Sequence, residues 1–249
     1  MPLTRFFTSF IFLFVLVSSC KTSYQAGAVQ YIDYQVSSKG KGDSSVSALL
    51  RPYWDSVNRT MNDVIAVAGM ELVKQQPEGT LNNVLADAMM TIGQEKFKTN
   101  IDAAFINYGG VRLNSIPAGD ITRGKIFEVA PFDNIIVLQK MNGTILQQFL
   151  DMVALRGGWP CSGISFQIKD KKATNIKIDD KPLVASSLYT IALLDYVANG
   201  GEDFSMLKNI PQQNNGDLFR DAVITYLSGY QKQGKLVTAK IENRITNAE

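Results

Sequence analysis

Histidine is absent from all 249 residues of this sequence. Without an imidazole, these residues cannot build a Ser–His or Cys–His nucleophilic couple, nor a zinc or two-metal centre with histidine ligands. Catalysis by carboxylates alone remains possible, but most hydrolase templates are excluded within these residues. An excess of one charge is also missing, because 25 basic and 23 acidic residues leave a net charge of +2. The charge balance therefore gives no indication of a nucleic-acid partner.

Long apolar runs are scarce, and the main one, from Phe6 to Val17, lies near the N-terminus. It is too short for a bilayer-spanning helix, which needs about 20 apolar residues, but it suits the core of a signal peptide. The following Val-Ser-Ser-Cys, ending at Cys20, resembles a bacterial lipoprotein lipobox. The resemblance implies cleavage before Cys20 and acylation of its thiol; ordinary secretion with cleavage nearby is the alternative.

The domain organisation follows from this start. We expect a lipoprotein signal peptide over residues 1–19, a flexible polar tether over 20–45 with room for one short strand at 31–36, and a folded domain over 46–245. Only two cysteines are present. If Cys20 is lipidated, Cys161 has no disulfide partner in the chain, so the fold must depend on its apolar core.

Hydrophobic periodicity predicts the elements of this domain. Helices are expected over 46–58, 80–93, 144–156 and 217–231. One or two strands are expected over 63–73, and single strands over 101–110, 135–141, 163–169, 174–179 and 189–197. Thr80 is a suitable N-cap, and the last helix is expected to bury Leu218, Ala222, Tyr226 and Tyr230. Helices and strands alternate irregularly, and the short strands at 163–179 look antiparallel. The pattern favours an α+β domain of mixed β-sheets packed with helices over a doubly wound parallel fold.

Two of the predicted strands end in glycine pairs, as NYGGVR (107–112) and as YVANGGEDF (196–204). Paired glycines after a buried strand allow positive φ angles and a close approach of the backbone to a ligand or to another loop. A plain tight turn is the alternative for each pair taken alone. Neither stretch has the GxGxxG spacing or the lysine of common nucleotide-binding loops.

Taken together and in order, four stretches are more specific. NYGGVR, IPAGDIT (116–122), PFDN (131–134) and DYVANGGEDF (195–204) resemble NGGxIR, IPAGDIT, PFGN and ANGGDGF of the C-terminal, substrate-binding domain of the 5′-nucleotidase/UDP-sugar hydrolase family. The predicted helix adds LNNVLADAM (81–89), which is similar to the family's LGNLxADAM. The resemblance extends over about residues 45–230.

This resemblance implies a role for each matching residue. Asn107 matches an asparagine that hydrogen-bonds the base, and Arg112 matches an arginine that contacts phosphate. Phe132 and Tyr196 match two aromatic residues that sandwich the nucleobase, and Glu202 matches an aspartate that accepts hydrogen bonds from ribose hydroxyls. The predicted substrate site is completed by the turn residues Gly109, Gly110, Asn199, Gly201 and Asp203; no residue is assigned to a metal or to catalysis.

Each assignment has a structural alternative. Arg112 would otherwise be a surface ion-pair residue, Phe132 a core residue, and Tyr196 a half-buried strand residue. Glu202 and Asp203 would be solvated acids of a turn. The sequence also departs from the family pattern at five positions. Gln75 replaces a phosphate-contacting arginine unless Lys74 takes its place, and Glu202 replaces the aspartate. Glycines of the family pattern are replaced by Tyr108, Asp133 and Asp203.

The family's catalytic domain, with its DxH and GNHD metal motifs, has no counterpart in these residues. The resemblance therefore implies the substrate-binding half of a split phosphohydrolase, not catalytic by itself and without a cofactor of its own. Divalent metals would belong to a separate metallophosphoesterase chain. We expect a lipid-anchored protein of the cell envelope, periplasmic or surface-exposed. The alternatives are a nucleotide- or nucleoside-binding lipoprotein with no catalytic partner, and a structural surface protein whose pocket has decayed.

Overall fold

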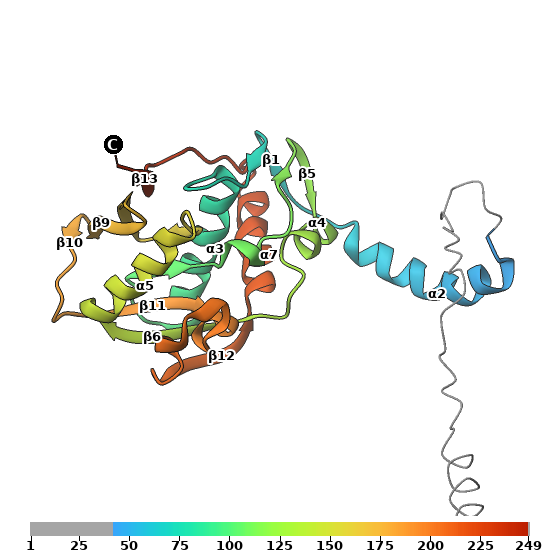
Figure 1. The fold of residues 1–249 in the computed structure, drawn as a ribbon. Coiled ribbons are helices and arrows are strands. Elements are labelled where there is room, and N and C mark those ends of the chain that lie inside the picture. Colours follow the sequence, from blue (N-terminus) through green and yellow to red (C-terminus); the bar gives the residue numbers. More distant parts are fainter. Residues whose placement is uncertain (1–41, 249) are drawn as a thin grey trace, which may run out of the picture. The chain divides into compact units, whose positions relative to one another are not determined.

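The computed structural model describes residues 42–248 (Figure 1). The predicted signal peptide, Cys20 and the expected strand at 31–36 lie outside the described residues, so they stay predictions. Between residues 42 and 248, no helix combines the length and the apolar character needed to cross a bilayer.

The described residues form helices and short strands in alternation. The α-helices are α2 (Ser44–Met61), α3 (Thr80–Phe97), α4 (Arg123–Val129), α5 (Gly143–Leu155), α6 (Asp195–Ala198) and α7 (Phe219–Lys232). The strands are β1 (Val64–Ala68), β2 (Leu72–Val73), β3 (Ala103–Phe105), β4 (Ser115–Ile116), β5 (Gly119–Thr122), β6 (Ile135–Asn142), β7 (Cys161–Ser162), β8 (Ile164–Lys169), β9 (Lys172–Ile178), β10 (Lys181–Pro182), β11 (Leu188–Leu194), β12 (Gln212–Leu218) and β13 (Ile245–Asn247). Three 3₁₀ turns are η1 (Tyr108–Gly110), η2 (Gly201–Asp203) and η3 (Ser205–Leu207).

The strands form mixed sheets. A central sheet has the order β12-β6-β11-β3-β7, in which β3 and β11 run parallel and the other neighbours antiparallel. A second sheet has the order β10-β9-β8-β13, in which β13 runs parallel to β8, and the predicted antiparallel pairing of β8 with β9 is confirmed. Helices pack against mixed sheets, so the predicted α+β class is also confirmed.

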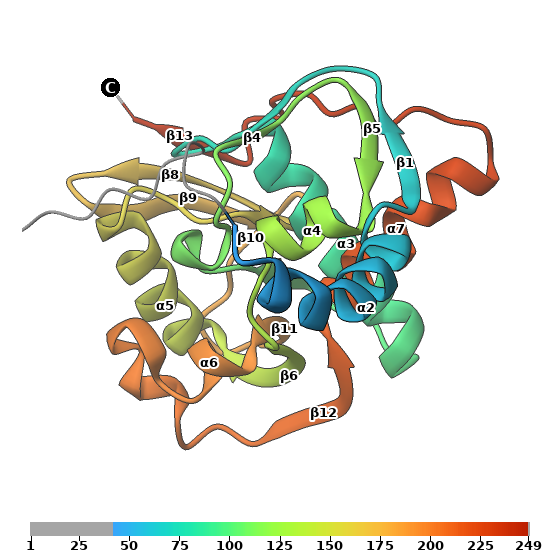
Figure 2. The same ribbon diagram turned by 90° about the vertical axis from the view of Figure 1, so that its right-hand side faces the viewer.

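The central sheet divides the core into two parts. Successive side chains of a strand point to opposite faces: in β11, Ala192 and Leu194 join one cluster with α3 and α7, whereas Ile191 and Leu193 join the other with α5 and the second sheet. Both ribbon views show α5 on one side of β6 and β11, with α3 and α7 on the other (Figures 1 and 2). In the second cluster, the rings of Trp159 and Phe204 lie 4.9 Å apart.

Helix α3 begins at the predicted residue and continues to Phe97, four residues beyond the predicted end. The predicted apolar stripe is buried throughout; it consists of Leu81, Leu85, Ala88, Met89 and Ile92. The prediction of Thr80 as the N-cap is wrong, because Gly79 takes that position and the Thr80 hydroxyl accepts a hydrogen bond from the Val73 amide instead (2.8 Å). A β-carbon on Gly79 would lie 2.5 Å from the Val73 carbonyl oxygen, so this crowded corner favours glycine.

Other predicted boundaries differ from the structure as well. The strand expected over 101–110 is only Ala103–Phe105, because the chain turns into η1 at the glycines. The strand expected over 189–197 ends at Leu194, and Tyr196 lies in the short helix α6. The last helix begins at Phe219, which leaves Leu218 in strand β12, a polar strand that the sequence analysis missed. Ala222 is buried as predicted, whereas Tyr226 and Tyr230 are only partly buried.

Helix α2 is longer than the predicted 46–58 and contains Pro52 in its interior. Apolar side chains recur at helical spacing in α2 and form a row along the helix. Leu49, Leu50, Tyr53, Trp54 and Val57 are all exposed, between 54% and 70%.

Candidate functional site

One cavity gathers most of the predicted site residues. Its volume is about 410 Å³, and it is lined by Asn107, Gly109, Gly110, Arg112, Phe132, Asn134, Tyr196 and Glu202. Seven of these eight were predicted from the sequence, and Asn134 was missed. The residues come from three parts of the chain that are far apart in sequence: the loop around η1, the segment before β6, and the turn that follows β11. The fold therefore brings together the stretches that the sequence motifs marked separately.

Two of the residues that line this cavity are aromatic and exposed to solvent. Phe132 is 47% exposed and Tyr196 is 49% exposed. A core phenylalanine would be sealed, and a tyrosine within a strand would take part in a ladder, so neither structural alternative describes these residues. The guanidinium carbon of Arg112 lies 5.9 Å from the centre of the Phe132 ring, within the range of a cation–π contact.

The segment that carries Phe132 is held from behind by Arg220 of α7, a buried residue. Its guanidinium donates to the Pro131 carbonyl (3.3 Å) and to Asp133 Oδ1 (2.6 Å), and it lies 4.1 Å above the ring of Phe127. Asp133, which departs from the family's glycine, thus has a defined structural role. It anchors the segment on which Phe132 stands.

The turn after α6 has an unusual backbone. Gly200, Glu202 and Asp203 have φ angles of 87°, 53° and 66°. Left-handed backbone costs a residue with a side chain about 1–2 kcal/mol, so Glu202 and Asp203 need stabilising contacts. Gly201 has no room for a side chain, because a β-carbon there would lie 2.6 Å from the Tyr196 ring. The turn therefore presses closely against Tyr196.

Arg156, at the C-terminal end of α5, supplies these stabilising contacts. Its Nη2 donates to the Glu202 carbonyl oxygen (2.7 Å) and to Asp203 Oδ2 (3.2 Å). Its Nε lies 3.9 Å from Glu202 Oε2, and its guanidinium carbon lies 5.1 Å from the centre of the Phe204 ring. One side chain thus holds the backbone and the carboxylates of the turn.

The Glu202 carboxylate also meets Asn107. The Asn107 Nδ2 donates to Glu202 Oε1 at 2.6 Å. Asn107 is only 5% exposed, and its Oδ1 is buried without a hydrogen-bond partner among the described residues. A β-carbon on Gly110 would lie 2.7 Å from this oxygen, which explains the second glycine of NYGGVR. Asn107 therefore fixes the direction of the Glu202 side chain.

Two cations, Arg112 and Lys74, lie near η1 and influence each other electrostatically. Arg112 is exposed and takes part in none of the ion pairs among residues 42–248, so the surface ion-pair alternative finds no support. Lys74 Nζ donates to the Val111 carbonyl (2.7 Å) and lies 3.9 Å from the centre of the Tyr108 ring. Burial, and secondly the charge of Arg112, lower the pKa of Lys74. Lys74 is thus the second cation near Arg112, whereas Gln75 is exposed and carries no charge.

The remaining predicted residues do not line the cavity. The Asn199 side-chain oxygen accepts a hydrogen bond from Gln212 (3.0 Å), and the Asp203 side chain is 91% exposed beside Arg156. Gly201 contributes by packing under Tyr196. Arg156 and Arg220, which the sequence analysis missed, carry no local signal, because each contacts a segment distant in sequence. Asn134 was visible as the last residue of PFDN.

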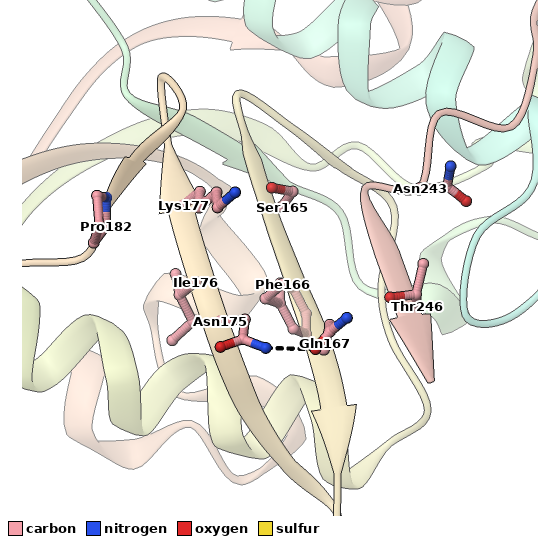
Figure 3. A pocket seen from close by; sticks show the side chains of 9 residues that line it. All are labelled: Ser165, Phe166, Gln167, Asn175, Ile176, Lys177, Pro182, Asn243 and Thr246. Carbon is pink, nitrogen blue, oxygen red and sulfur yellow. Dashed lines mark hydrogen bonds between the residues drawn. The ribbon is translucent and has the colours of Figure 1, made fainter. Parts of the chain in front are cut away.

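A second hollow, of about 600 Å³, lies on the second sheet (Figure 3). It is lined by Ser165, Phe166, Gln167, Asn175, Ile176, Lys177, Pro182, Asn243 and Thr246. Figure 3 shows a hydrogen bond between the side chains of Asn175 on β9 and Gln167 on β8. The Asn175 Nδ2 donates to Gln167 Oε1 at 2.6 Å. Among the described residues that line the hollow, Lys177 alone is charged.

Metal ligands do not gather in either place. Within residues 42–248 there is no group of three or more histidine, cysteine, aspartate or glutamate side chains that could hold a metal ion.

Comparisons with known proteins agree with the motifs. The model of the family described as "5'-nucleotidase, C-terminal domain" matches residues 58–209. The 5'-nucleotidase of Vibrio cholerae serotype O1 is 29% identical over 198 residues, which are 75% of this chain and 34% of that protein. The cell wall protein Lmo0130 of Listeria monocytogenes is 23% identical over 228 residues, 81% of this chain and 29% of that protein.

Among solved structures, the 5'-nucleotidase precursor from Thermus thermophilus superposes with a TM-score of 0.70 at 26% identity. The match covers 82% of this chain and 43% of that one. The chain thus spans less than half the length of each of these proteins. Since the family model covers more than half of the sequence and the fold agrees with it, the chain belongs to the family of 5′-nucleotidase C-terminal domains.

Proposed function

We propose that this chain is the substrate-binding half of a 5′-nucleotidase-like phosphohydrolase, and that its 410 Å³ cavity binds the nucleoside part of a nucleotide. A separate chain hydrolyses the phosphate ester. One observation carries the proposal: two exposed aromatic rings, a carboxylate and an exposed guanidinium, from distant parts of the sequence, line one cavity.

The base is the first part of the proposed ligand. Phe132 and Tyr196 stack on its two faces, and each aromatic face contributes about 1–3 kcal/mol, as in proteins that bind single-stranded nucleic acid. Asn134 lines the same cavity with an amide that can donate and accept at once, which suits the edge of a base. The side-chain amide of Asn107 donates one N–H to Glu202, and its second N–H remains available to the base.

The charged side chains of the site are assigned to the sugar and to the phosphate. Glu202 accepts hydrogen bonds from the ribose hydroxyls, because an ionised carboxylate is a strong acceptor with two oxygens. Arg112 meets the phosphate with its planar fork, and Lys74 adds positive charge behind it. This second charge compensates for the absence of the arginine that Gln75 replaces.

Hydrolysis is assigned to a partner. A two-metal hydrolase uses its metals to activate water and to stabilise the phosphoryl oxygens. The described residues offer no ligand set for such a centre, and the 249 residues contain no histidine. We therefore assign the divalent metals to a separate metallophosphoesterase chain, and to this chain the positioning of the substrate. Positioning by itself lowers a barrier by several kcal/mol.

We further propose that the protein stands at the cell envelope, anchored by a lipid on Cys20, and is periplasmic or surface-exposed. Two facts support this placement. The sequence before Cys20 resembles a lipobox, and the relative from Listeria is named a cell wall protein.

The test combines binding with turnover. Calorimetry of the chain with AMP and with adenosine is expected to show binding of both. The chain is then mixed with a metallophosphoesterase of the same organism that carries DxH and GNHD motifs, in the presence of manganese. Release of phosphate from AMP is expected only in the mixture. Binding without hydrolysis in the mixture would favour a binding lipoprotein with no catalytic partner, and no binding in any sample would refute the proposal.

A further inference from the structure

Two arginines that do not line the cavity hold its two walls. Arg220 binds the segment of Phe132, and Arg156 binds the turn of Glu202. Each donates to a backbone carbonyl and to a carboxylate, and each lies against an aromatic ring, Phe127 or Phe204. One wall presents the aromatic ring of Phe132 to the cavity, and the other presents the carboxylate of Glu202.

Arg156 is itself fixed from a fourth segment. Gln76, in the loop before α3, donates through Nε2 to the carbonyl oxygens of Arg156 (2.6 Å) and Gly158 (2.8 Å). Gly157 and Gly158, with φ angles of 85° and 98°, bring the chain close enough for this contact. The C-terminal end of α5 therefore has little freedom, and the guanidinium is held where the turn needs it.

The Glu202 carboxylate is consequently held from two directions. Oε1 accepts from Asn107 at 2.6 Å, and Oε2 lies 3.9 Å from Arg156 Nε. An ionised carboxylate has about four acceptor sites, so most remain free for other donors. Side-chain accessibility of 25% for Glu202 shows that solvent, and hence a ligand hydroxyl, reaches this group.

We propose that Arg156 is a positioning residue that sets the preference of the cavity for ribose over deoxyribose. The inference rests on the proposed function, because it requires a nucleoside in the cavity. Arg156 stabilises the left-handed backbone of Glu202 and orients its carboxylate toward the sugar hydroxyls. Without this guanidinium the turn relaxes, and the carboxylate loses the position from which it accepts two neighbouring hydroxyl groups.

The matched comparison is Arg220. It serves the wall that carries Phe132, which touches the base and not the sugar hydroxyls. A change at Arg220 is therefore expected to weaken the binding of ribo- and dideoxynucleosides by the same factor. A change at Arg156 is expected to weaken the binding of the ribonucleoside more than that of the dideoxynucleoside.

The experiment measures the affinities of adenosine and 2′,3′-dideoxyadenosine by calorimetry, for the full chain and for Arg156→Met, Arg156→Lys and Arg220→Lys. The unaltered chain is expected to bind adenosine on the order of tenfold more tightly, as charge-assisted hydrogen bonds predict. Arg156→Met brings this ratio close to one, because it weakens the binding of adenosine more than that of the dideoxynucleoside. Arg156→Lys, which keeps the charge but not the fork, gives an intermediate ratio, and Arg220→Lys leaves the ratio unchanged.

The outcomes distinguish a failure of the proposed function from a failure of the role of Arg156. If the unaltered chain binds neither nucleoside, the proposed function fails. If it discriminates and both Arg156 variants keep the full ratio, the role of Arg156 is refuted while the proposed function stands. Equal affinities of the unaltered chain for adenosine and for 2′,3′-dideoxyadenosine would also refute the role of Arg156. Thermal melts identify variants that do not fold; should Arg156→Met be one of them, the ratio in Arg156→Lys decides.

Discussion

Replacing Tyr196 by alanine tests the stacking part of the proposed site most directly. The side chain is 49% exposed and stands on the short helix α6 at the mouth of the cavity. Its removal opens no core cavity, so we expect a small loss of stability, within about 1 kcal/mol, in the range of substitutions at exposed positions. Folding and binding effects are thus separable in the same variant.

The loss of binding follows from the stacking energy. One aromatic face is worth about 1–3 kcal/mol to a bound base, and 1.4 kcal/mol corresponds to a tenfold change in affinity. The dissociation constant of adenosine is therefore expected to rise roughly 5- to 150-fold. Phe132→Ala is expected to give a rise of the same order, since Phe132 supplies the other face.

The assay is isothermal calorimetry with adenosine, accompanied by a urea melt of each variant. Tyr53→Ala is the matched control, because Tyr53 is a tyrosine with 70% exposure on α2 and does not line the cavity. It should change the affinity less than twofold. Equal affinities for Tyr196→Ala and the unaltered chain, in a folded variant, would show that the ring does not stack on a base.

Three further predictions concern the scaffold. Gly110→Ala places a β-carbon 2.7 Å from Asn107 Oδ1 and displaces the amide from Glu202; a urea melt should show a loss of about 1–3 kcal/mol, and an unchanged midpoint would contradict the close packing. Asp87→Asn weakens the pair of hydrogen bonds from Arg244 (2.7 and 2.9 Å) that ties the segment before β13 to α3; a loss of about 1–3 kcal/mol is expected, and limited proteolysis should then cut near β13 first. Burial raises the pKa of the Cys161 thiol to about 12, so in a Cys20→Ser variant a thiol reagent at pH 8 should react only after unfolding; rapid labelling of the folded chain would refute this.

Much of the site could be predicted because its residues lie in short, ordered motifs. The stretches NYGGVR, PFDN and YVANGGEDF contain all eight residues that line the cavity, including the missed Asn134. The fold class was equally accessible, since apolar periodicity marks most helices and strands.

The supports of the site could not be predicted from the sequence. Arg156 and Glu202 are 46 positions apart, and Arg220 and Asp133 are 87 apart. An arginine at the end of a helix gives no indication of which distant carbonyl it will meet. Local competition explains the other errors: Thr80 bonds the Val73 amide rather than capping its helix, and α6 interrupts an apolar run that resembles a continuous strand.

The two tryptophans of the chain provide separate spectroscopic reporters. Trp54 on α2 is 69% exposed, whereas Trp159 is 1% exposed and packs against Phe204, directly beyond the turn that Arg156 holds. Acrylamide should quench the emission of Trp54 and spare that of Trp159. In a Trp54→Phe variant, intrinsic fluorescence would therefore follow the packing under the cavity without any added label, and would show when the neighbourhood of the 201–204 turn loosens.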